Sequence, residues 1–217
     1  MYKPQGEQIT DSIVLTPEFR VSFPYVLTGQ EQVRDDGKKV TKYSVCLLFP
    51  KGADLSLLVK MVEKCMADKF GPDKSKWPKI RLPFRDQADK ADKWKGYEPG
   101  AYYFTATSNE KPGVVGPDAT ADGKPRRITE PSEFYAGCYA VATVNAFYYK
   151  TKGNEGIGIG LRNIQKTREG EPLGNRASAE TEFKPLQAAT PGGVLGAMSG
   201  ATPAPNALAD IFGGMMK

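Results

Sequence analysis

Apolar and polar residues alternate along several stretches of the chain, which is the period-two pattern of half-buried β-strands. The stretch 18–27 places three apolar residues on one face: Phe19, Val21 and Phe23. The stretch 39–50 does the same with Tyr43, Val45, Leu47 and Phe49. Further strand signals lie in residues 100–108 and 132–139, before a hairpin that follows them directly.

One stretch has helical spacing instead. Apolar residues recur there at every third or fourth position: Leu55, Leu58, Val59, Val62, Met66 and Phe70. Asp54 is suited to cap the start of this helix, and Gly71 and Pro72 are suited to end it. We interpret the apolar stripe as core packing and not as a cofactor site.

These elements predict a mainly β domain with one prominent helix, closed as a small barrel or a sandwich. Long Gly-, Pro- and Asp-rich loops interrupt the pattern, and no internal repeat or heptad run is present. After Leu186 the composition changes to Ala, Gly and Pro with almost no charge. We therefore expect a folded domain over 1–185 and a low-complexity, flexible tail over 186–217.

The hairpin at 137–165, GCYAVATVNAFYYKTKGNEGIGIGLRNIQ, has two unlike faces. One face of its first strand is small and apolar, as a narrow barrel interior requires: Cys138, Ala140, Ala142, Val144 and Ala146. The other carries the rings: Tyr139, Val141, Thr143, Asn145, Phe147 and Tyr149. Parity therefore predicts that the aromatic face points outward.

The second strand of this hairpin carries glycine at alternate positions. Parity places Ile157, Ile159 and Leu161 inside. The outward set is Gly158, Gly160, Arg162, Lys166 and Arg168. Bare glycines beside aromatic rings could leave ring faces open for nucleic-acid bases, with the cations beside them for phosphate. Alternatively, the long loop or the helix covers the rings, and the glycines permit close packing.

Charge favours the first interpretation. The net charge is +5 and the pI about 9.0, a mild bias toward a polyanionic partner. Residues 74–95 combine rings with positive charge: Trp77, Lys79, Arg81, Arg85 and Trp94. Arg126 and Arg127 form a third cationic group. Three such clusters indicate a nucleic-acid surface more than a solvated one.

Several chemistries find no support. Histidine is absent, which removes the commonest general base and metal ligand. The three cysteines are scattered, with no C-x-x-C pair, so we interpret them as free thiols. The alternating glycines do not fit a dinucleotide loop, and no phosphate-binding P-loop occurs. Asp86, Asp89 and Asp92 could coordinate Mg²⁺, but with Lys90 and Lys93 between them we interpret them as a solvated loop.

Six runs of the sequence form a pattern by their order and spacing: FRVSFPYVL, KYSVCLLFPKG, LPFRD, PGVV, EFYAGCYAVATVNAFYY and GIGIGLRNIQKTREGEPLGNRASAETEF. This pattern resembles that of a family of bacteriophage single-stranded DNA-binding proteins, long catalogued as a domain of unknown function. The resemblance spans roughly residues 13 to 185. Its most specific pieces are EFYAGCY and GLRNIQKTREGEPLG.

The resemblance implies an OB-like fold that binds single-stranded DNA with little sequence preference, in phage replication or recombination. With the residue patterns, it assigns DNA contacts to Trp77, Lys79, Arg81, Arg85, Trp94, Tyr103, Arg126, Arg127, Tyr139, Phe147, Tyr149, Lys150, Arg162 and Lys166. It implies no catalysis, cofactor or metal. The expected partners are single-stranded DNA and, through the tail, phage or host replication proteins.

Two features depart from simple expectation. The helix follows the second clear strand, whereas a simple OB barrel has its helix between the third and fourth. The tail ends in ADIFGGMMK, with Asp210 as its one acid, unlike the acidic tails of bacterial single-strand binders. The tail is either disordered or forms a short amphipathic helix after Asn206.

Two other functions stay open: a carboxylate- and Mg²⁺-dependent nuclease, and a structural virion barrel protein. No apolar run long enough to span a bilayer and no signal peptide are present, so we expect no membrane partner. The expected location is the cytoplasm of the infected bacterial host.

Overall fold

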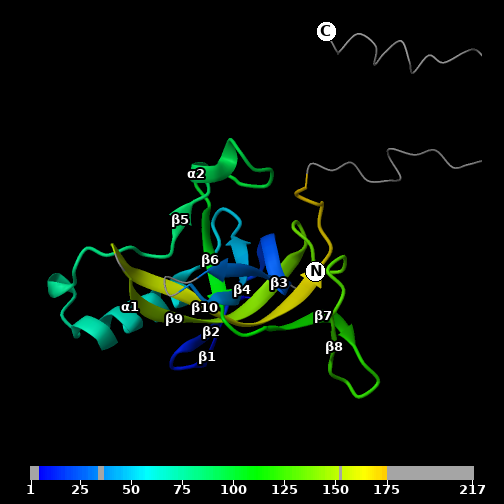
Figure 1. The fold of residues 1–217 in the computed structure, drawn as a ribbon, viewed down its shortest axis with the longest axis horizontal. Coiled ribbons are helices and arrows are strands. Elements are labelled where there is room, and N and C mark those ends of the chain that lie inside the picture. Colours follow the sequence, from blue (N-terminus) through cyan, green and yellow to red (C-terminus); the bar gives the residue numbers. More distant parts are fainter. Residues whose placement is uncertain (1–4, 34–36, 152, 175–217) are drawn as a thin grey trace, which may run out of the picture. The chain divides into compact units, whose positions relative to one another are not determined.

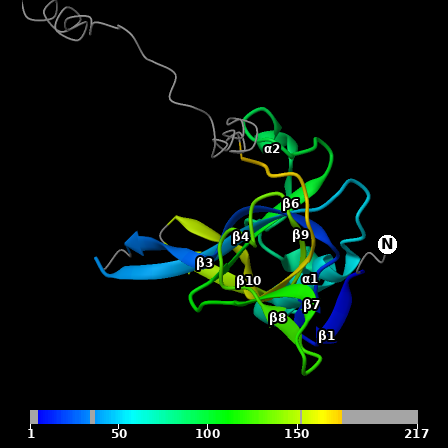
Figure 2. The same ribbon diagram turned by 90° about the vertical axis from the view of Figure 1, so that its right-hand side faces the viewer.

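The computed structural model describes residues 5–33, 37–151 and 153–174, so the tail predicted from residue 186 lies outside the described part. The strands are β1 (Glu7–Thr10), β2 (Ile13–Leu15), β3 (Phe19–Val33), β4 (Lys39–Leu48), β5 (Arg85–Asp86), β6 (Tyr102–Ser108), β7 (Gly113–Ala119), β8 (Pro125–Arg127), β9 (Tyr139–Thr151) and β10 (Asn154–Arg168). The helices are α1 (Ser56–Phe70), a 3-10 turn η1 (Lys74–Lys76) and α2 (Ala88–Ala91). Figure 1 traces them along the chain, and Figure 2 shows the same ribbon turned by 90°.

Five strands are joined in a ring of pairings, in the order β9, β3, β4, β6, β10 and back to β9. All these pairs are antiparallel except β6 with β10. This is the Greek-key ring of an OB fold, with β3, β4, β6, β9 and β10 as its first to fifth strands. The β3–β9 and β6–β10 junctions each pair over only two positions, so the ring is not a clean barrel. The predicted mainly β, OB-like fold is confirmed.

The long helix α1 lies between the second and third strands of the ring, as its place in the sequence predicts. Asp54 Oδ1 accepts the backbone N–H of Ser56 at 2.9 Å, and Gly71 follows the last turn with a φ of 90°. The residues it buries are Leu58, Met61, Val62 and Met66. Val59, which the periodicity placed in the stripe, is 42% exposed.

The barrel interior follows the parity predicted for the hairpin. Buried positions on β9 include the small residues Ala140, Ala142 and Val144. On β10 they are Ile157, Ile159 and Leu161, also as predicted. Narrow side chains on β9 leave room for the rings of Phe19, Phe49 and Phe104, which fill the centre.

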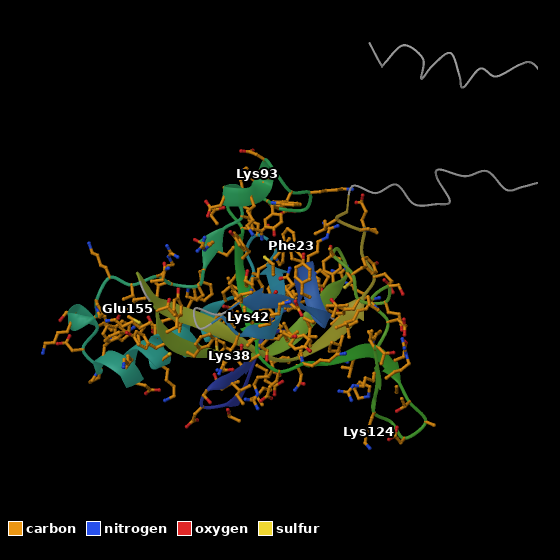
Figure 3. All side chains as sticks on the ribbon, viewed as in Figure 1. Phe23, Lys38, Lys42, Lys93, Lys124 and Glu155 are labelled. Carbon is orange, nitrogen blue, oxygen red and sulfur yellow. The ribbon has the colours of Figure 1, made fainter. Side chains whose placement is uncertain are left out.

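A second, smaller apolar cluster lies on the outer face of β4 and β6. It contains Cys46, Leu48, Tyr97 and Tyr103, and the segment 87–97 supplies its cover. Phe23 packs against this cluster and not against the barrel core, contrary to the predicted alternation. The cause is a break in β3 pairing between Ser22 and Tyr25, where Phe23 takes a φ of 48°. Figure 3 labels Phe23 at this position.

Buried Gln87 ties the covering segment to the barrel. Its side chain is 2% exposed, and Nε2 donates to the carbonyls of Phe49 at 2.8 Å and Tyr102 at 2.9 Å. Its Oε1 accepts the backbone N–H of Glu98 at 2.9 Å. One amide thus pairs with three backbone groups, of which the Tyr102 carbonyl also accepts the backbone N–H of Phe49 at 3.0 Å.

Gln87→Leu is expected to lower the free energy of unfolding by about 1–3 kcal/mol, because buried backbone groups lose their partners. Urea denaturation followed by far-UV circular dichroism measures it. Gln32→Leu, at an exposed position on β3, should stay within about 0.5 kcal/mol of the parent. Equal denaturation midpoints for Gln87→Leu and the parent would contradict this role.

Candidate nucleic-acid interface

Three side chains of β9 lie directly over three glycines of β10. The registered pairs are Tyr149 with Gly156, Phe147 with Gly158 and Asn145 with Gly160. A Cβ at these glycines would lie 2.9 Å from the Tyr149 hydroxyl, 2.6 Å from the Phe147 ring and 2.6 Å from the Asn145 amide. We call these three β9 residues and their glycines the hairpin ladder.

The ladder explains the glycine alternation in the sequence. Each glycine lets a β9 side chain rest on the backbone of β10, which is the close packing of the second interpretation. The packing covers only one side of each ring, because Phe147 remains 39% exposed. Phe147 and Tyr149 also lie side by side, with their centroids 6.5 Å apart. The outward aromatic face predicted from parity is therefore present.

A groove of ≈ 250 Å³ adjoins the ladder on its β6 side. Gly158 and Tyr149 of the hairpin form one wall, and Tyr103 and Thr105 of β6 contribute to the other. Three cations line it: Arg81, Arg85 and Lys90. We call it the basic groove. Local pairing positions two of these cations: the backbone of Arg81 bridges Gly156 in parallel, and Arg85 on β5 pairs with Tyr103.

No carboxylate of the described residues forms an ion pair with a cation of the basic groove, Arg81, Arg85 or Lys90. The ammonium of Lys90 instead lies 4.9 Å from the ring centroid of Tyr103, 5.5 Å from that of Phe23 and 5.7 Å from that of Tyr97. Rings hold a cation in place without cancelling its charge, so the groove presents a positioned positive site.

Other predicted cations lie outside the groove and are exposed. Arg162 is the extra residue where the β9–β10 pairing shifts between Leu161 and Asn163. Arg127 lies on β8, opposite Val115 of β7. Lys79 lies in the loop before Arg81. None of these three forms an ion pair with a residue that the structure describes. In the strand order, β10 lies between β9 and β7, and β8, which carries Arg127, follows β7.

The two tryptophans occupy separate places. Trp77 is half-buried against the core, and its Nε1 donates to the carbonyl of Gly71 at 2.8 Å, which fixes the chain after α1. Trp94 is 49% exposed and meets the edge of Phe23, with centroids 5.0 Å apart. Trp94 therefore belongs to the segment that covers β4 and β6, and Trp77 contributes to packing.

Several predicted DNA contacts are already engaged within the protein. The Arg168 guanidinium lies 3.3 Å from the ring centroid of Tyr139 and pairs with Glu18. Tyr103 is only 3% exposed, beneath Lys90. Lys150 pairs with Glu155 at 3.3 Å.

Arg126 is paired as well, with Glu133 at 2.5 Å. The Arg126 guanidinium holds the pKa of the Glu133 carboxyl below its usual range, so this pair persists at neutral pH.

The prediction that Lys166 faces outward is wrong. Its side chain is 7% exposed, and its ammonium donates to the carbonyl of Glu133 at 2.7 Å and to Glu169 at 2.6 Å. The pairing shift at Arg162 inverts the parity of the strand, so that Ile164 and Lys166 both turn inward. Lys166 therefore supports the fold beneath the sheet.

Sequence reasoning assigned no function to two residues of this region. Lys90 lies in the run of alternating Asp and Lys that indicated a solvated loop, and only the fold brings it onto the rings of Phe23, Tyr97 and Tyr103. Asn145 was placed outward by parity, but no chemistry was assigned to it. A polar residue paired with glycine inside an aromatic strand was the available signal.

The described residues hold no group of three His, Cys, Asp or Glu side chains that could bind a metal ion. Asp86, the first of the aspartate run, accepts the backbone N–H groups of Ala88 and Gly100, which lower the pKa of its carboxyl. It therefore caps the turn into α2. Among the same residues, no helix has the length and apolar character to cross a membrane.

Solved structures with a similar fold include proteins of two phages. The single-stranded DNA-binding protein of bacteriophage Enc34, solved in complex with ssDNA, aligns with a TM-score of 0.57 and 21% identity, over 75% of this chain and 90% of that one. The single-stranded DNA-binding protein gp2.5 of bacteriophage T7 aligns with a TM-score of 0.50 and 13% identity, over 85% of this chain and 98% of that one. At such identities these likenesses support the fold.

Sequence comparison identifies the family. The protein p50 of Acyrthosiphon pisum secondary endosymbiont phage 1 is 30% identical over 185 residues, which are 78% of this chain and 91% of that protein. The model of the family described by the ssDNA-binding protein of Enterobacter phage Enc34 matches residues 12–194. The chain therefore belongs to the Enterobacter phage Enc34 ssDNA-binding protein family.

Proposed function

We propose that this protein binds single-stranded DNA without sequence preference, in the basic groove and across the hairpin ladder. The observation that carries the proposal is the meeting of three cations, Arg81, Arg85 and Lys90, with the exposed ring of Phe147 and the neighbouring Tyr149. No carboxylate of the described residues pairs with these cations. In OB folds the face of the second and third strands and the loop between the fourth and fifth bind oligonucleotides. Here these are the outer face of β4 and β6 and the β9–β10 hairpin.

The mechanism divides between charge and stacking. Arg81, Arg85 and Lys90 contact phosphates, and Phe147 and Tyr149 take bases on their open faces. Successive ladder residues are two positions apart on a strand, so they are spaced by roughly 6.6 Å. That exceeds the rise of about 3.4 Å per nucleotide in a duplex strand, so bases on neighbouring rungs separate from one another. The surface therefore suits an extended single strand and disfavours duplex.

We propose that Arg162 and Arg127 continue the phosphate contacts past the ladder, and that Lys79 and Trp94 add contacts beside the groove. Trp77, Tyr103, Tyr139, Arg126 and Lys166 then serve mainly to hold the fold, because each is packed or paired within it. Lys150 can contact phosphate only by leaving Glu155.

In this proposal the protein coats and protects single-stranded DNA without catalysis, during phage replication or recombination in the cytoplasm of the infected host. The folded domain over 1–185 binds DNA, and the tail over 186–217 contacts phage or host replication proteins. Membership of the ssDNA-binding family supports the DNA-binding role.

Titration with oligo-dT at several salt concentrations tests the function. Binding is expected to quench tryptophan emission, since Trp94 lies beside the groove residue Lys90 through their shared contact with Phe23. The affinity should fall steeply with salt, duplex should bind much more weakly, and the DNA should be recovered intact. Absence of binding at low salt would exclude the proposal, and Mg²⁺-dependent loss of the oligonucleotide would favour a nuclease instead.

Removing one groove cation should lower the salt dependence. Arg81→Gln, Arg85→Gln and Lys90→Gln should each reduce the slope of log K against log salt by about 0.7, the value for one phosphate contact to a single strand. Lys93→Gln is the matched control, because Lys93 is an exposed lysine three residues after Lys90 and does not line the groove (Figure 3). Equal slopes for Lys90→Gln and Lys93→Gln would remove Lys90 from the DNA path.

Phe147→Ala should weaken oligo-dT binding by about 1–3 kcal/mol, the value of one stacked base, and leave the salt slope unchanged. Tyr102→Ala removes a ring that is 54% exposed but lies outside the ladder, and it should bind as the parent does. Fluorescence titration and thermal melting are measured on the same samples. A Phe147→Ala protein that melts early yet binds normally per folded molecule would show that the ring is only structural.

A further inference from the structure

The outer face of the barrel carries a row of polar side chains beside the ring of Phe147. Strand register places Asn145 of β9, Gly160 of β10, Thr107 of β6 and Ser44 of β4 in one line across four neighbouring strands. Side chains in one such row point to the same face of a sheet. All three polar residues are half-buried, and the next row inward, Ile159, Ala106 and Val45, is buried in the core.

None of these three polar side chains hydrogen-bonds to another described residue. The contrast with nearby polar residues is direct. Thr143 Oγ1, two positions before Asn145, accepts the backbone N–H of Asn163 at 3.2 Å. Asn163 Oδ1 accepts the backbone N–H of Gly113 at 3.1 Å. No described residue therefore uses the donors or the acceptor of the Asn145 amide, and a half-buried amide gains from a partner.

Gly160 shapes the space around that amide. It lies between Asn145 and Thr107, whose strands are two inter-strand spacings apart, or about 9–10 Å. The Asn145 amide rests on Gly160, since a Cβ there would lie 2.6 Å from Oδ1. The ring of Phe147 occupies the next rung in the same way, over Gly158. The exposed ring of Phe147 therefore lies two residues along β9 from the Asn145 amide, and both side chains rest on glycine backbone of β10.

We propose that Asn145 hydrogen-bonds the edge of a DNA base held on this face, with Thr107 on the opposite side of Gly160. The inference rests on the proposed function and names a further binding residue within it. A base stacked on Phe147 leaves its donors and acceptors at its rim, and bases that follow along the ladder bring theirs over Gly160. The amide then supplies one donor and one acceptor to that rim.

This contact recognises that a base is present and not which base it is. An amide carries a donor and an acceptor side by side, and half a turn about its last torsion exchanges them. Every base offers a donor next to an acceptor on its pairing edge, so either orientation of the amide finds a match. Asn145 therefore adds affinity for nucleobases while it preserves tolerance of sequence, which stacking and phosphate contacts already allow.

A chemical change in the DNA tests the contact. The protein is titrated with a 15-nucleotide dT oligomer and with the same oligomer made of N3-methylthymidine, whose methyl group replaces the N3–H donor. For the parent the methylated oligomer should bind about 5- to 10-fold more weakly, corresponding to one hydrogen bond of about 1–1.4 kcal/mol. For Asn145→Ala the two oligomers should differ less than about 2-fold, because the partner of N3–H is gone.

Gly160→Ala provides a second variant. Gly160 has an ordinary backbone conformation, so alanine is tolerated there, but its Cβ displaces the Asn145 amide. It should lose the discrimination as Asn145→Ala does. Asn109→Ala, at an exposed asparagine in the β6–β7 loop, should keep it. Equal thermal midpoints establish that all three variants are folded.

The outcomes separate the two proposals. If the parent binds neither oligomer, the proposed function itself fails. If the parent binds both and methylation costs the same in the parent and in Asn145→Ala, DNA binding stands and the base-edge contact is excluded. If Asn145→Ala removes the discrimination while Gly160→Ala retains it, the amide does not act from its position over Gly160, which also overturns the proposal.

Discussion

The contact between β9 side chains and the bare backbone of β10 organises this protein. Barrel closure needs small residues on the inner face of β9, and the outer face of the same strand carries rings and an amide. Both faces depend on a single register, because a shift by one residue would exchange them. Gly158 and Gly160 support that register, since a Cβ at either would lie 2.6 Å from the β9 side chain opposite. At Gly156 a Cβ would meet the backbone carbonyl of Arg81 at 2.5 Å as well as the Tyr149 hydroxyl at 2.9 Å. The fold of the barrel and the chemistry of its surface are therefore set by the same pairing.

The cationic side chains fall into two groups, one that supports the fold and one that lines the basic groove. Cations that support the structure are paired, as Arg168 is with Glu18 and Lys166 with Glu169. The cations that line the basic groove form no ion pair with a carboxylate of the described residues, and the ammonium of Lys90 contacts aromatic rings instead. A carboxylate in that position would compete with phosphate, whereas a ring stabilises the ammonium and leaves its charge available. The covering segment, anchored by Gln87, thus serves both a small apolar cluster and the groove beside it.

The sequence predicted the features that depend on local periodicity. Parity placed Ala140, Val144, Ile157 and Ile159 inside, and helical spacing located α1 after the second strand of the ring. Two of the errors fall where the backbone leaves its period. Phe23 turns away from the core at a break in β3, and Lys166 turns inward after the shift at Arg162.

Long-range contacts were beyond local periodicity as well. Nothing near Lys90 in the sequence indicates that the rings of Phe23, Tyr97 and Tyr103 will gather around its ammonium. The bond from the Trp77 indole to the carbonyl of Gly71 spans only six residues, but no periodicity predicts it. The two tryptophans belong to one cationic stretch in the sequence, but the turn from α1 into β5 and α2 separates their roles.

The hairpin ladder also constrains how this family can change over evolutionary time. Each rung pairs a large β9 side chain with a β10 glycine that leaves space for it, so a substitution of either residue alone disturbs the contact. A side chain gained on β10 expels a ring, and a ring lost from β9 exposes backbone that a larger residue can then cover. Substitutions along this hairpin should therefore occur in pairs, so the surface proposed to bind DNA should change as slowly as a core although it faces solvent.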